Sequence, residues 1–300
     1  KCTRLFIFKI DVMSERRIMQ YNNIAFIGFG LIAGSIAKAI RKYRPESRIY
    51  AYTNNRSELL KGKSDGIIDI ILEGIDSTLS DCDIVFLCTP VEFNDKYLND
   101  IKSYISKDAI VTDVGSTKSS IHSLAKELEL EDVFIGGHPM AGSEKTGYAA
   151  SDALLLENAY YMITPSSKVN VEKLKVFSGI IESIKAIPFV IDYQKHDKVV
   201  ATISHLPHII AATLVNLVSE NDYDDGVMKR VAAGGFKDIT RIASASPIMW
   251  EQICMLNSES INIMLRKYID TLEDVYSHLS AKSSTYINNM FAKSGEYRNS

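Results

Sequence analysis

The sequence has few of the residues that mark several protein classes. Among its 300 residues are four cysteines with no close C-x-x-C pair, so it predicts neither a disulfide framework nor a zinc site. Cys82 and Cys88 lie in or beside an apolar run and are expected to be core thiols in a reducing cytoplasm. The net charge is only −3, which gives no reason to expect nucleic acid or an anionic membrane as a partner. No apolar run approaches the ~20 residues of a membrane-spanning helix.

The composition is that of a globular protein, with 46% hydrophobic and 24% charged residues, and its length allows two domains. Short apolar strands alternate with helices over residues 23–192, which predicts an α/β domain with a mostly parallel, doubly wound Rossmann-type sheet. Residues 193–300 read as helices only, so we expect an all-helical second domain there. Residues 1–22 are treated as an N-terminal extension. Long helices are predicted at 203–219, 248–276 and 279–291.

One stretch, NIAFIGFGLIAGSIAKA at 23–39, has the pattern of a dinucleotide site. An apolar strand runs into a glycine turn, and a helical pattern follows. Gly28 allows a sharp turn out of the strand, Gly30 lets the backbone approach a pyrophosphate, and Ala33 lets the helix pack closely. The N-terminus of the helix then directs N–H groups at the phosphates. The alternative is a tight glycine turn in some other α/β fold.

The residue that selects the cofactor usually ends the second strand of such a unit, where a carboxylate binds the ribose 2′-hydroxyl of NAD. Here this position is Thr53, and Asn54, Asn55 and Arg56 follow it. A hydroxyl, two amides and a cation suit a 2′-phosphate, so the sequence favours NADP over NAD. The alternative is that Arg56 only caps or solvates the next helix and that NAD binds without a carboxylate. Further cofactor contacts are expected at Leu31, Ile32, Thr89 and Pro90.

Two more motifs follow predicted strands, at the edge of the sheet where ligands bind in this fold class. In DVGSTK at 113–118, Ser116 and Thr117 either face the nicotinamide or cap the next helix. In GGHPMAGSEKTG at 136–147, glycines surround His138. A histidine at a strand end beside the nicotinamide can act as a base, because its ordinary pKa lies near neutrality. A purely structural histidine is the alternative.

The predicted helical domain contributes two polar motifs. SHLPH at 204–208 opens its first long helix, and His205 and His208 are expected to share a helix face. The sequence has no third candidate ligand at a spacing typical of metal sites, so we predict no metal. We expect these histidines to bind a substrate carboxylate instead. GGFKDITR at 234–241 leads to Arg241, which holds a carboxylate through two parallel hydrogen bonds or forms a surface salt bridge.

Five motifs in this order, GFGLIAGS, DVGSTK, GGHPMAGSEKTG, SHLPH and GGFKDITRIASASPIMW, closely resemble the prephenate dehydrogenase family of tyrosine biosynthesis. This family includes the arogenate and cyclohexadienyl dehydrogenases, and the likeness covers about residues 23–290. It implies a cytoplasmic NAD- or NADP-dependent oxidoreductase that converts prephenate to 4-hydroxyphenylpyruvate. It also implies a homodimer built through the helical domain, with active sites near the domain cleft. The missing acidic residue at Thr53 departs from the family pattern.

The resemblance implies roles for single residues. His138 accepts the proton of the substrate's ring hydroxyl, and Ser116 assists it beside the nicotinamide. His208 binds the ring carboxylate with Ser204 beside it, and Arg241 holds the pyruvyl side chain. The other substrate contacts implied are Ser143, Glu144 and Gly234.

Several functions stay open on the sequence alone. An arogenate dehydrogenase uses the same chemistry on an amino acid, and His208 and Arg241 serve the carboxylates of either substrate. A catalytically silent NAD(P)-binding regulator is a second alternative, against which His138 argues because a sensor needs no base. A reductase of imines or 2-hydroxy acids on the same two-domain plan is a third.

Overall fold

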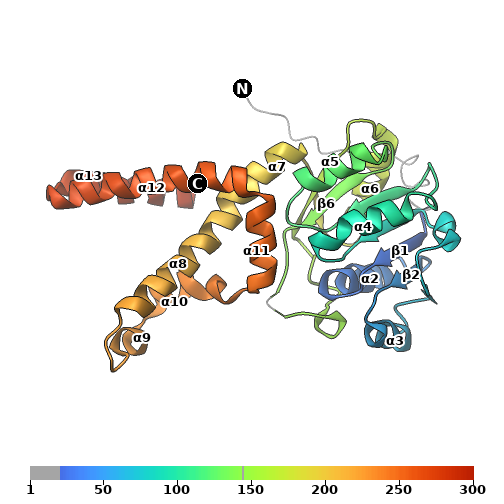
Figure 1. Cartoon of the computed structure of the whole chain (residues 1–300), viewed down its shortest axis with the longest axis horizontal. Coiled ribbons are helices and arrows are strands. Elements are labelled where there is room, and N and C mark those ends of the chain that lie inside the picture. The colour runs from blue at the N-terminus through green and yellow to red at the C-terminus, as the bar shows by residue number, and fades with distance from the viewer. Residues whose placement is uncertain (1–20, 144) are drawn as a thin grey trace. The chain divides into compact units, whose positions relative to one another are not determined.

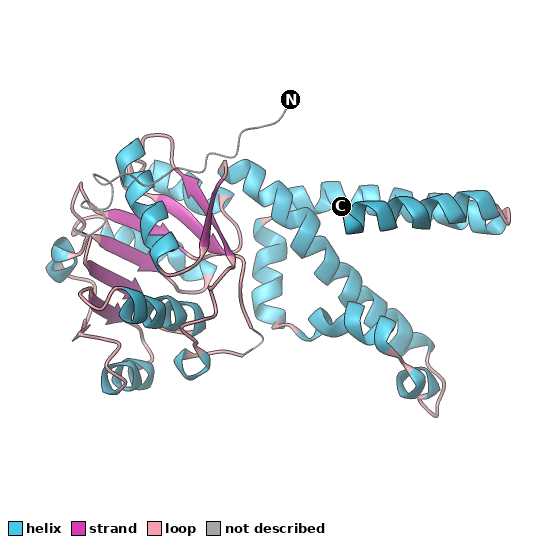
Figure 2. Cartoon of the chain, turned by 180° about the vertical axis from the view of Figure 1, so that it is seen from behind, coloured by secondary structure: helices cyan, strands magenta, loops and turns pink. Residues whose placement is uncertain are grey.

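The computed structural model of the chain describes residues 21–143 and 145–300 (Figure 1). Glu144 and most of the predicted N-terminal extension therefore lie outside the described residues. By its internal contacts the chain divides into two units. The first reaches Val200 and includes Ser244–Leu256, and the second holds Ala201–Ala243 and Asn257–Ser300. Every strand of the described residues precedes Tyr193, and helices follow it (Figure 2).

The first unit is built on a parallel sheet with the strand order β3-β2-β1-β4-β5. This confirms the predicted doubly wound fold. The order reverses between β1 and β4, and ligands of such sheets bind beyond the carboxyl ends of the strands at that point. The strands are β1 (Asn23–Ile27), β2 (Arg48–Tyr52), β3 (Ile70–Ile71), β4 (Ile84–Leu87) and β5 (Ile110–Asp113).

Helices cover both faces of this sheet, which explains why its strands are apolar almost throughout. Alternate residues of β1 join different cores, because successive side chains of a strand point to opposite faces. Phe26 belongs to the cluster that contains Ile36 of α2, whereas Ala25 belongs to the cluster with Leu98 of α4 and Ile121 of α5. The helices of this part are α2 (Leu31–Tyr43), α3 (Arg56–Ser64), α4 (Val91–Ile101) and α5 (Ser119–Glu127).

A second, three-stranded sheet follows, with the order β6-β7-β8, and a parallel bridge between Val111 and Phe134 joins it to the first. The strands β7 and β8 are parallel, but β6 and β7 are antiparallel, which differs from the expected pattern. A parallel pair needs a long crossover, usually a helix, and between β6 and β7 the described chain has only a short 3-10 turn at Tyr148–Ala150. The elements are β6 (Ile135–Pro139), β7 (Tyr160–Pro165), α6 (Val171–Ser183) and β8 (Ile187–Val190).

The remaining elements are helical and differ from the predicted bounds. The helix predicted at 248–276 is two helices that break at Asn257, whose buried side chain donates a hydrogen bond to His205 Nδ1 at 3.2 Å. Asparagine is favoured at helix N-caps, and Asn257 is the N-cap of α12, so the sequence held a local signal for this break that its analysis missed. The helix predicted at 279–291 begins and ends later. The helices are α7 (Tyr193–Val200), α8 (Leu206–Asn221), α9 (Val227–Val231), α10 (Gly234–Thr240), α11 (Pro247–Leu256), α12 (Ser258–Ser280) and α13 (Ser284–Asn299).

A π-helical segment, Ala201–His205, connects α7 to α8. Pro207 follows it and has no backbone N–H for the regular α-helical ladder, which accounts for a local change of hydrogen bonding here. The whole stretch, Tyr193–Asn221, is long and apolar enough to cross a membrane by length and composition, a property that the sequence analysis missed. Such a test is weak evidence, since core helices of globular proteins also pass it.

Candidate active site

The glycine turn after β1 has the geometry of a dinucleotide site. Gly28 has φ of +87°, and a Cβ atom there would lie 2.7 Å from the carbonyl carbon of Cys88, so only glycine fits. At Gly30 a Cβ atom would meet no protein atom within 4 Å. The packing of the protein therefore gives no reason for a glycine there, whereas a closely approaching pyrophosphate does.

The helix α2 supplies the second part of this site. It begins at Leu31, directly after Gly30, and its ladder starts with the bond from Gly34 N to Gly30 O at 2.9 Å. The N–H groups of its first turn, Ile32 included, thus have no acceptor within the helix and point toward the turn. Beside the turn, Thr89 donates a hydrogen bond to Asn94 at 3.1 Å, and Pro90 caps α4. These residues fit a bound dinucleotide.

A carboxylate that follows β3, and that the sequence analysis missed, lies beside the residues that follow β2. Arg56 binds Glu73 through two bonds, Nη1 to Oε2 at 2.8 Å and Nη2 to Oε1 at 3.2 Å. Glu73 lies 17 residues beyond Arg56 and reaches it because β3 pairs with β2. Both side chains are exposed. Thr53 and Asn54 follow β2 as expected, and the amide oxygen of Asn54 accepts a bond from the Tyr52 hydroxyl at 3.1 Å.

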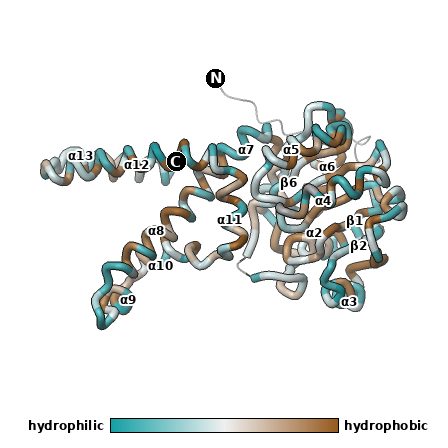
Figure 3. Tube along the Cα trace, viewed as in Figure 1, coloured by the Kyte–Doolittle hydropathy of each residue, from teal (hydrophilic) through white to brown (hydrophobic). Residues whose placement is uncertain are grey.

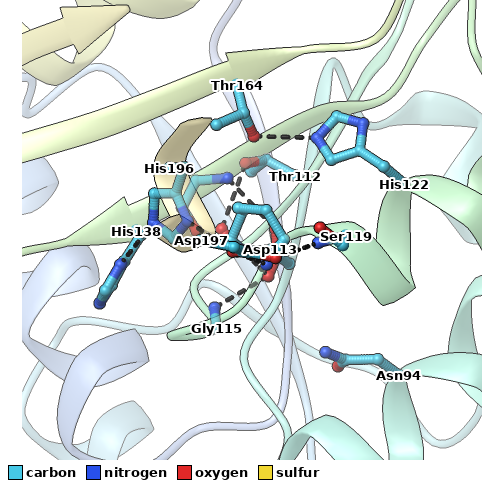
Figure 4. A network of polar contacts seen from close by, with 12 residues as sticks. Asn94, Thr112, Asp113, Gly115, Ser119, His122, His138, Thr164, His196 and Asp197 are labelled. Carbon is cyan, nitrogen blue, oxygen red and sulfur yellow. Dashed lines mark hydrogen bonds and ion pairs between the residues drawn. The ribbon is translucent and has the colours of Figure 1, made fainter. Parts of the chain in front are cut away.

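His138 lies inside β6, opposite Met162 of β7, rather than just after a strand as predicted. Its Nδ1 is 2.8 Å from Nε2 of His196, and Nδ1 of His196 is 2.8 Å from Oδ1 of Asp197 (Figure 4). His196 and Asp197 are buried, and both come from α7. The two histidines are 58 residues apart, so no local pattern could have connected them.

Asp197 also holds the loop that carries Ser116. Its Oδ1 accepts a bond from the backbone N–H of Lys118, and its Oδ2 accepts one from that of Ser119, both at 2.8 Å (Figure 4). These N–H groups belong to the N-terminus of α5, where a carboxylate is favoured by the helix dipole. Ser116 is partly buried in this loop.

A buried ion pair joins Lys118 of the same loop to Asp113 at the end of β5, and both side chains also bond to Gly137 of β6. The ammonium group of Lys118 also donates to the backbone carbonyl of Gly137 at 2.8 Å, and the Gly137 N–H donates to Asp113 at 3.2 Å. A Cβ atom on Gly137 would lie 2.6 Å from the Asp113 carbonyl oxygen, so glycine is needed next to His138. Burial lowers the pKa of Lys118, and the charge of Asp113 opposes that effect.

Burial lowers the pKa of His196, and the carboxylate of Asp197 only partly opposes this. For Asp197 burial favours the neutral acid, but the bonds from His196, Ser119 and Lys118 outweigh it and hold the pKa below its ordinary value. At neutral pH the pair therefore consists of a neutral imidazole and a carboxylate. The third histidine of this region, His122, bonds Thr164 at 2.9 Å, and burial lowers its pKa to about 4.

The second unit contains the other predicted polar residues. His208 Nδ1 donates to the backbone carbonyl of Ser204 at 2.8 Å. Burial lowers the pKa of His208, and the nearby positive charge of Arg241 lowers it further, so the structure brings these two side chains together. Arg241 and Gly234 are exposed, at the end and the start of α10. His205 is buried against Asn257 and does not join this group.

Of the remaining predicted substrate contacts, Ser143 is exposed, and its hydroxyl accepts a bond from the Lys145 N–H at 3.2 Å. Glu144 lies outside the described residues. Cys82 is a buried free thiol, as predicted, and burial raises its pKa to about 12; Cys88, predicted to be in the core, and Cys254 are free and partly buried. Within the described ranges, no three His, Cys, Asp or Glu side chains are grouped to hold a metal ion.

Comparison with known proteins identifies relatives over nearly the whole chain. The family model "Prephenate dehydrogenase, nucleotide-binding domain" matches residues 36–189, and "Prephenate dehydrogenase, dimerization domain" matches residues 192–293. The chain is 36% identical to the prephenate dehydrogenase of Bacillus subtilis (strain 168) over 281 residues, which are 92% of this chain and 75% of that protein.

Two solved structures are similar in fold. Prephenate dehydrogenase from A. aeolicus, in complex with hydroxyphenyl propionate and NAD+, aligns with a TM-score of 0.86 at 29% identity, over 92% of this chain and 97% of that one. Synechocystis arogenate dehydrogenase aligns with a TM-score of 0.83 at 27% identity, over 92% and 99% of the two chains. The glycine turn, the helix that follows it and these matches agree: the chain is an NAD(P)-dependent oxidoreductase and belongs to the prephenate dehydrogenase family.

Proposed function

We propose that this chain catalyses the oxidative decarboxylation of prephenate to 4-hydroxyphenylpyruvate, with NAD(P) as the hydride acceptor, in cytoplasmic tyrosine biosynthesis. The observation that carries the proposal is the placement of His138. It lies on β6 in the same unit as the dinucleotide turn, and a chain of two hydrogen bonds connects it to a buried carboxylate. Such an arrangement suits a general base.

In the proposed reaction His138 takes the proton of the ring hydroxyl while the hydrogen on the same ring carbon leaves as hydride. The bound cofactor supplies the acceptor for that hydride. The ring carboxylate then departs as carbon dioxide, and its bonding electrons enter the ring, which becomes aromatic. The proton returns from His138 to the phenolate oxygen, so no proton is gained or lost overall. Aromatisation is strongly downhill, and the protein chiefly supplies position and a base.

The substrate-binding residues follow from the same proposal. We assign the ring carboxylate to His208 and Ser204, and the pyruvyl side chain to Arg241, whose planar guanidinium binds a carboxylate through two hydrogen bonds. Ser116 assists His138. The remaining proposed contacts with the substrate are Ser143, Glu144 and Gly234. An arogenate dehydrogenase is the second candidate, which the similarity to the Synechocystis arogenate dehydrogenase favours.

For the cofactor, the sequence favours NADP through Thr53, Asn54 and Arg56, whereas one observation in the structure favours NAD. Arg56 is already engaged by Glu73 through both ends of its guanidinium group. A 2′-phosphate has to displace that carboxylate and approach its negative charge, whereas a 2′-hydroxyl does not. We therefore propose that the enzyme uses NAD in preference to NADP.

We further propose a homodimer formed through a helical domain at 193–300, with the dinucleotide-binding domain at 23–192. Apolar residues recur along α8 (Figure 3). Several large apolar side chains of the helical unit are exposed in the single chain, and an interface between two copies would bury them. These are Leu217, Ile263, Leu272, Tyr276 and Phe291. Sedimentation equilibrium of the purified chain measures the oligomeric state, and a monomer at micromolar concentration would contradict this part.

The test of the function is reduced-cofactor formation by the purified chain, in the four combinations of prephenate or arogenate with NAD or NADP. We expect turnover with prephenate and a higher kcat/KM with NAD. Turnover with arogenate alone keeps the chemistry and changes the substrate. Silence in all four combinations, from folded protein that binds NAD in calorimetry, contradicts the proposed function.

A further inference from the structure

The contact between His138 and His196 is informative because of what lies behind it. Nδ1 of His196 is 2.8 Å from a carboxylate oxygen of Asp197. An ionised carboxylate only accepts hydrogen bonds, so this nitrogen of His196 carries a proton. A neutral imidazole carries one proton, so Nε2 of His196 is an acceptor. It lies 2.8 Å from His138 Nδ1, which must then carry a proton and donate it.

His196 has to be neutral for this pattern of hydrogen bonds, and its surroundings keep it neutral. The side chain is fully buried. The charged groups around it are Asp197 on its own helix α7, Asp113 from β5 and Lys118 at the start of α5, and the net effect with burial is a lowered pKa. A protonated His196 would donate a hydrogen bond from Nε2 as well. Nδ1 of His138 would then accept that bond with its lone pair, and the proton of a neutral His138 would lie on Nε2.

Asp197 is held in place independently of the histidines. The backbone N–H groups of Lys118 and Ser119 each donate to it at 2.8 Å. These bonds keep the carboxylate ionised and oriented before any substrate arrives, which is the requirement for a preorganised electrostatic partner.

We propose that His196 and Asp197 are positioning residues that keep neutral His138 protonated on Nδ1, so that Nε2 is the basic nitrogen. The inference rests on the proposed function, in which His138 is the base. As His138 takes a proton on Nε2, its Nδ1–H stays bonded to His196, and the charge of Asp197 behind it stabilises the imidazolium that forms. The aspartate of the Ser-His-Asp triad acts on its histidine by the same logic.

The test uses two substitutions of His196 and one matched control. His196→Leu removes both hydrogen bonds, while His196→Gln keeps an amide oxygen to accept from His138 and an amide N–H₂ to donate to Asp197. His122→Gln replaces another buried histidine of this unit, which bonds Thr164 and Ser166 instead. Each protein is labelled with ¹⁵N-histidine, and His138 is assigned by comparison with His138→Asn.

The spectra of the wild type are expected to show neutral His138 with its proton on Nδ1. His196→Leu loses this preference and His196→Gln retains it. In kinetics, His196→Leu is expected to lower kcat about 10- to 150-fold, the effect of one hydrogen bond to a charged group, with little change in the KM for prephenate. The acid limb of its kcat profile moves to lower pH, because the protonated form of His138 has lost its support. His196→Gln recovers most of kcat, and His122→Gln matches the wild type in both measurements.

A wild-type His138 that carries its proton on Nε2 overturns the inference, whatever the activity. Equal losses of kcat in His196→Leu and His122→Gln, with unchanged pH profiles, also overturn it, because they indicate general damage to the fold. If the wild type turns over neither prephenate nor arogenate while the spectra show the expected tautomer, the proposed function fails and the positioning of His138 stands.

Discussion

The two units hold their polar groups in different ways. Around His138, the side chains of Asp113, Lys118, His196 and Asp197 are each 5% exposed or less and are bonded to one another or to nearby backbone. In the helical unit, by contrast, Arg241 is exposed and His208 only partly buried. The polar groups of the first unit are therefore held by one another within the chain, whereas those of the second are open to solvent in the single chain. On the proposed function, the first should control the chemical step and the second the binding of substrate.

His138→Asn is the sharpest test of that division and the largest expected effect. Asparagine retains a polar side chain but has no basic nitrogen, so kcat should fall by about 10² to 10⁴, the usual contribution of a general base. The affinity for NAD, measured by calorimetry, should be unchanged. Retained turnover would place the base elsewhere and remove the distinction between the units.

Arg241→Ala tests the proposed role of the helical unit in binding the substrate. Loss of a charge-assisted pair to a substrate carboxylate should raise the KM for prephenate about 10- to 150-fold, with a much smaller change in kcat. Arg230→Ala, an exposed cation of α9 in the same unit, is the control and should leave KM within about twofold, as expected for a surface substitution. A fall in kcat at constant KM would show that Arg241 acts in the chemical step.

Acid should destabilise the first unit through His122. Its pKa is about 4 in the folded protein and ordinarily 6.5, so the unfolded chain binds a proton first as the pH falls. The stability from neutral His122 is complete above pH 6.5, is lost progressively toward pH 4, and amounts to at most about 3 kcal/mol.

Urea unfolding at pH 7 and pH 4.5, monitored by a signal that reports on the first unit, measures this loss in the free energy of unfolding. In His122→Gln the side chain no longer titrates, so the difference between the two pH values should shrink. An identical difference in both proteins would assign the acid sensitivity to other groups.

Glu73→Gln is expected to have the smallest effect. Removal of the carboxylate frees Arg56 and should raise the ratio of kcat/KM for NADP to that for NAD about two- to fivefold, the range of an exposed ion pair. Arg56→Ala should lower the same ratio. A ratio that neither substitution changes would show that the pair of Arg56 and Glu73 does not select the cofactor.

Local signals in the sequence were sufficient for much of the first unit. The glycine turn and the apolar helix after it predict α2 at Leu31–Tyr43, and the structure has the same bounds. The first two apolar runs predict strands at 24–28 and 48–53; the first is shifted by one residue from β1, and the second ends one residue later than β2. Apolar runs bounded by turn residues mark such elements because both faces of the sheet are covered.

Contacts between distant segments could not be predicted from the sequence. The antiparallel pairing of β6 with β7 and the approach of Glu73 to Arg56 each depend on where another element packs. The sequence by itself determined the fold class and the dinucleotide turn, and it made His138 a candidate base, because each has a motif within about a dozen residues. Only the tertiary structure showed that His196 and Asp197 stand behind His138, since that network is assembled from β6, α7 and the start of α5 by packing and not by neighbouring residues in the chain.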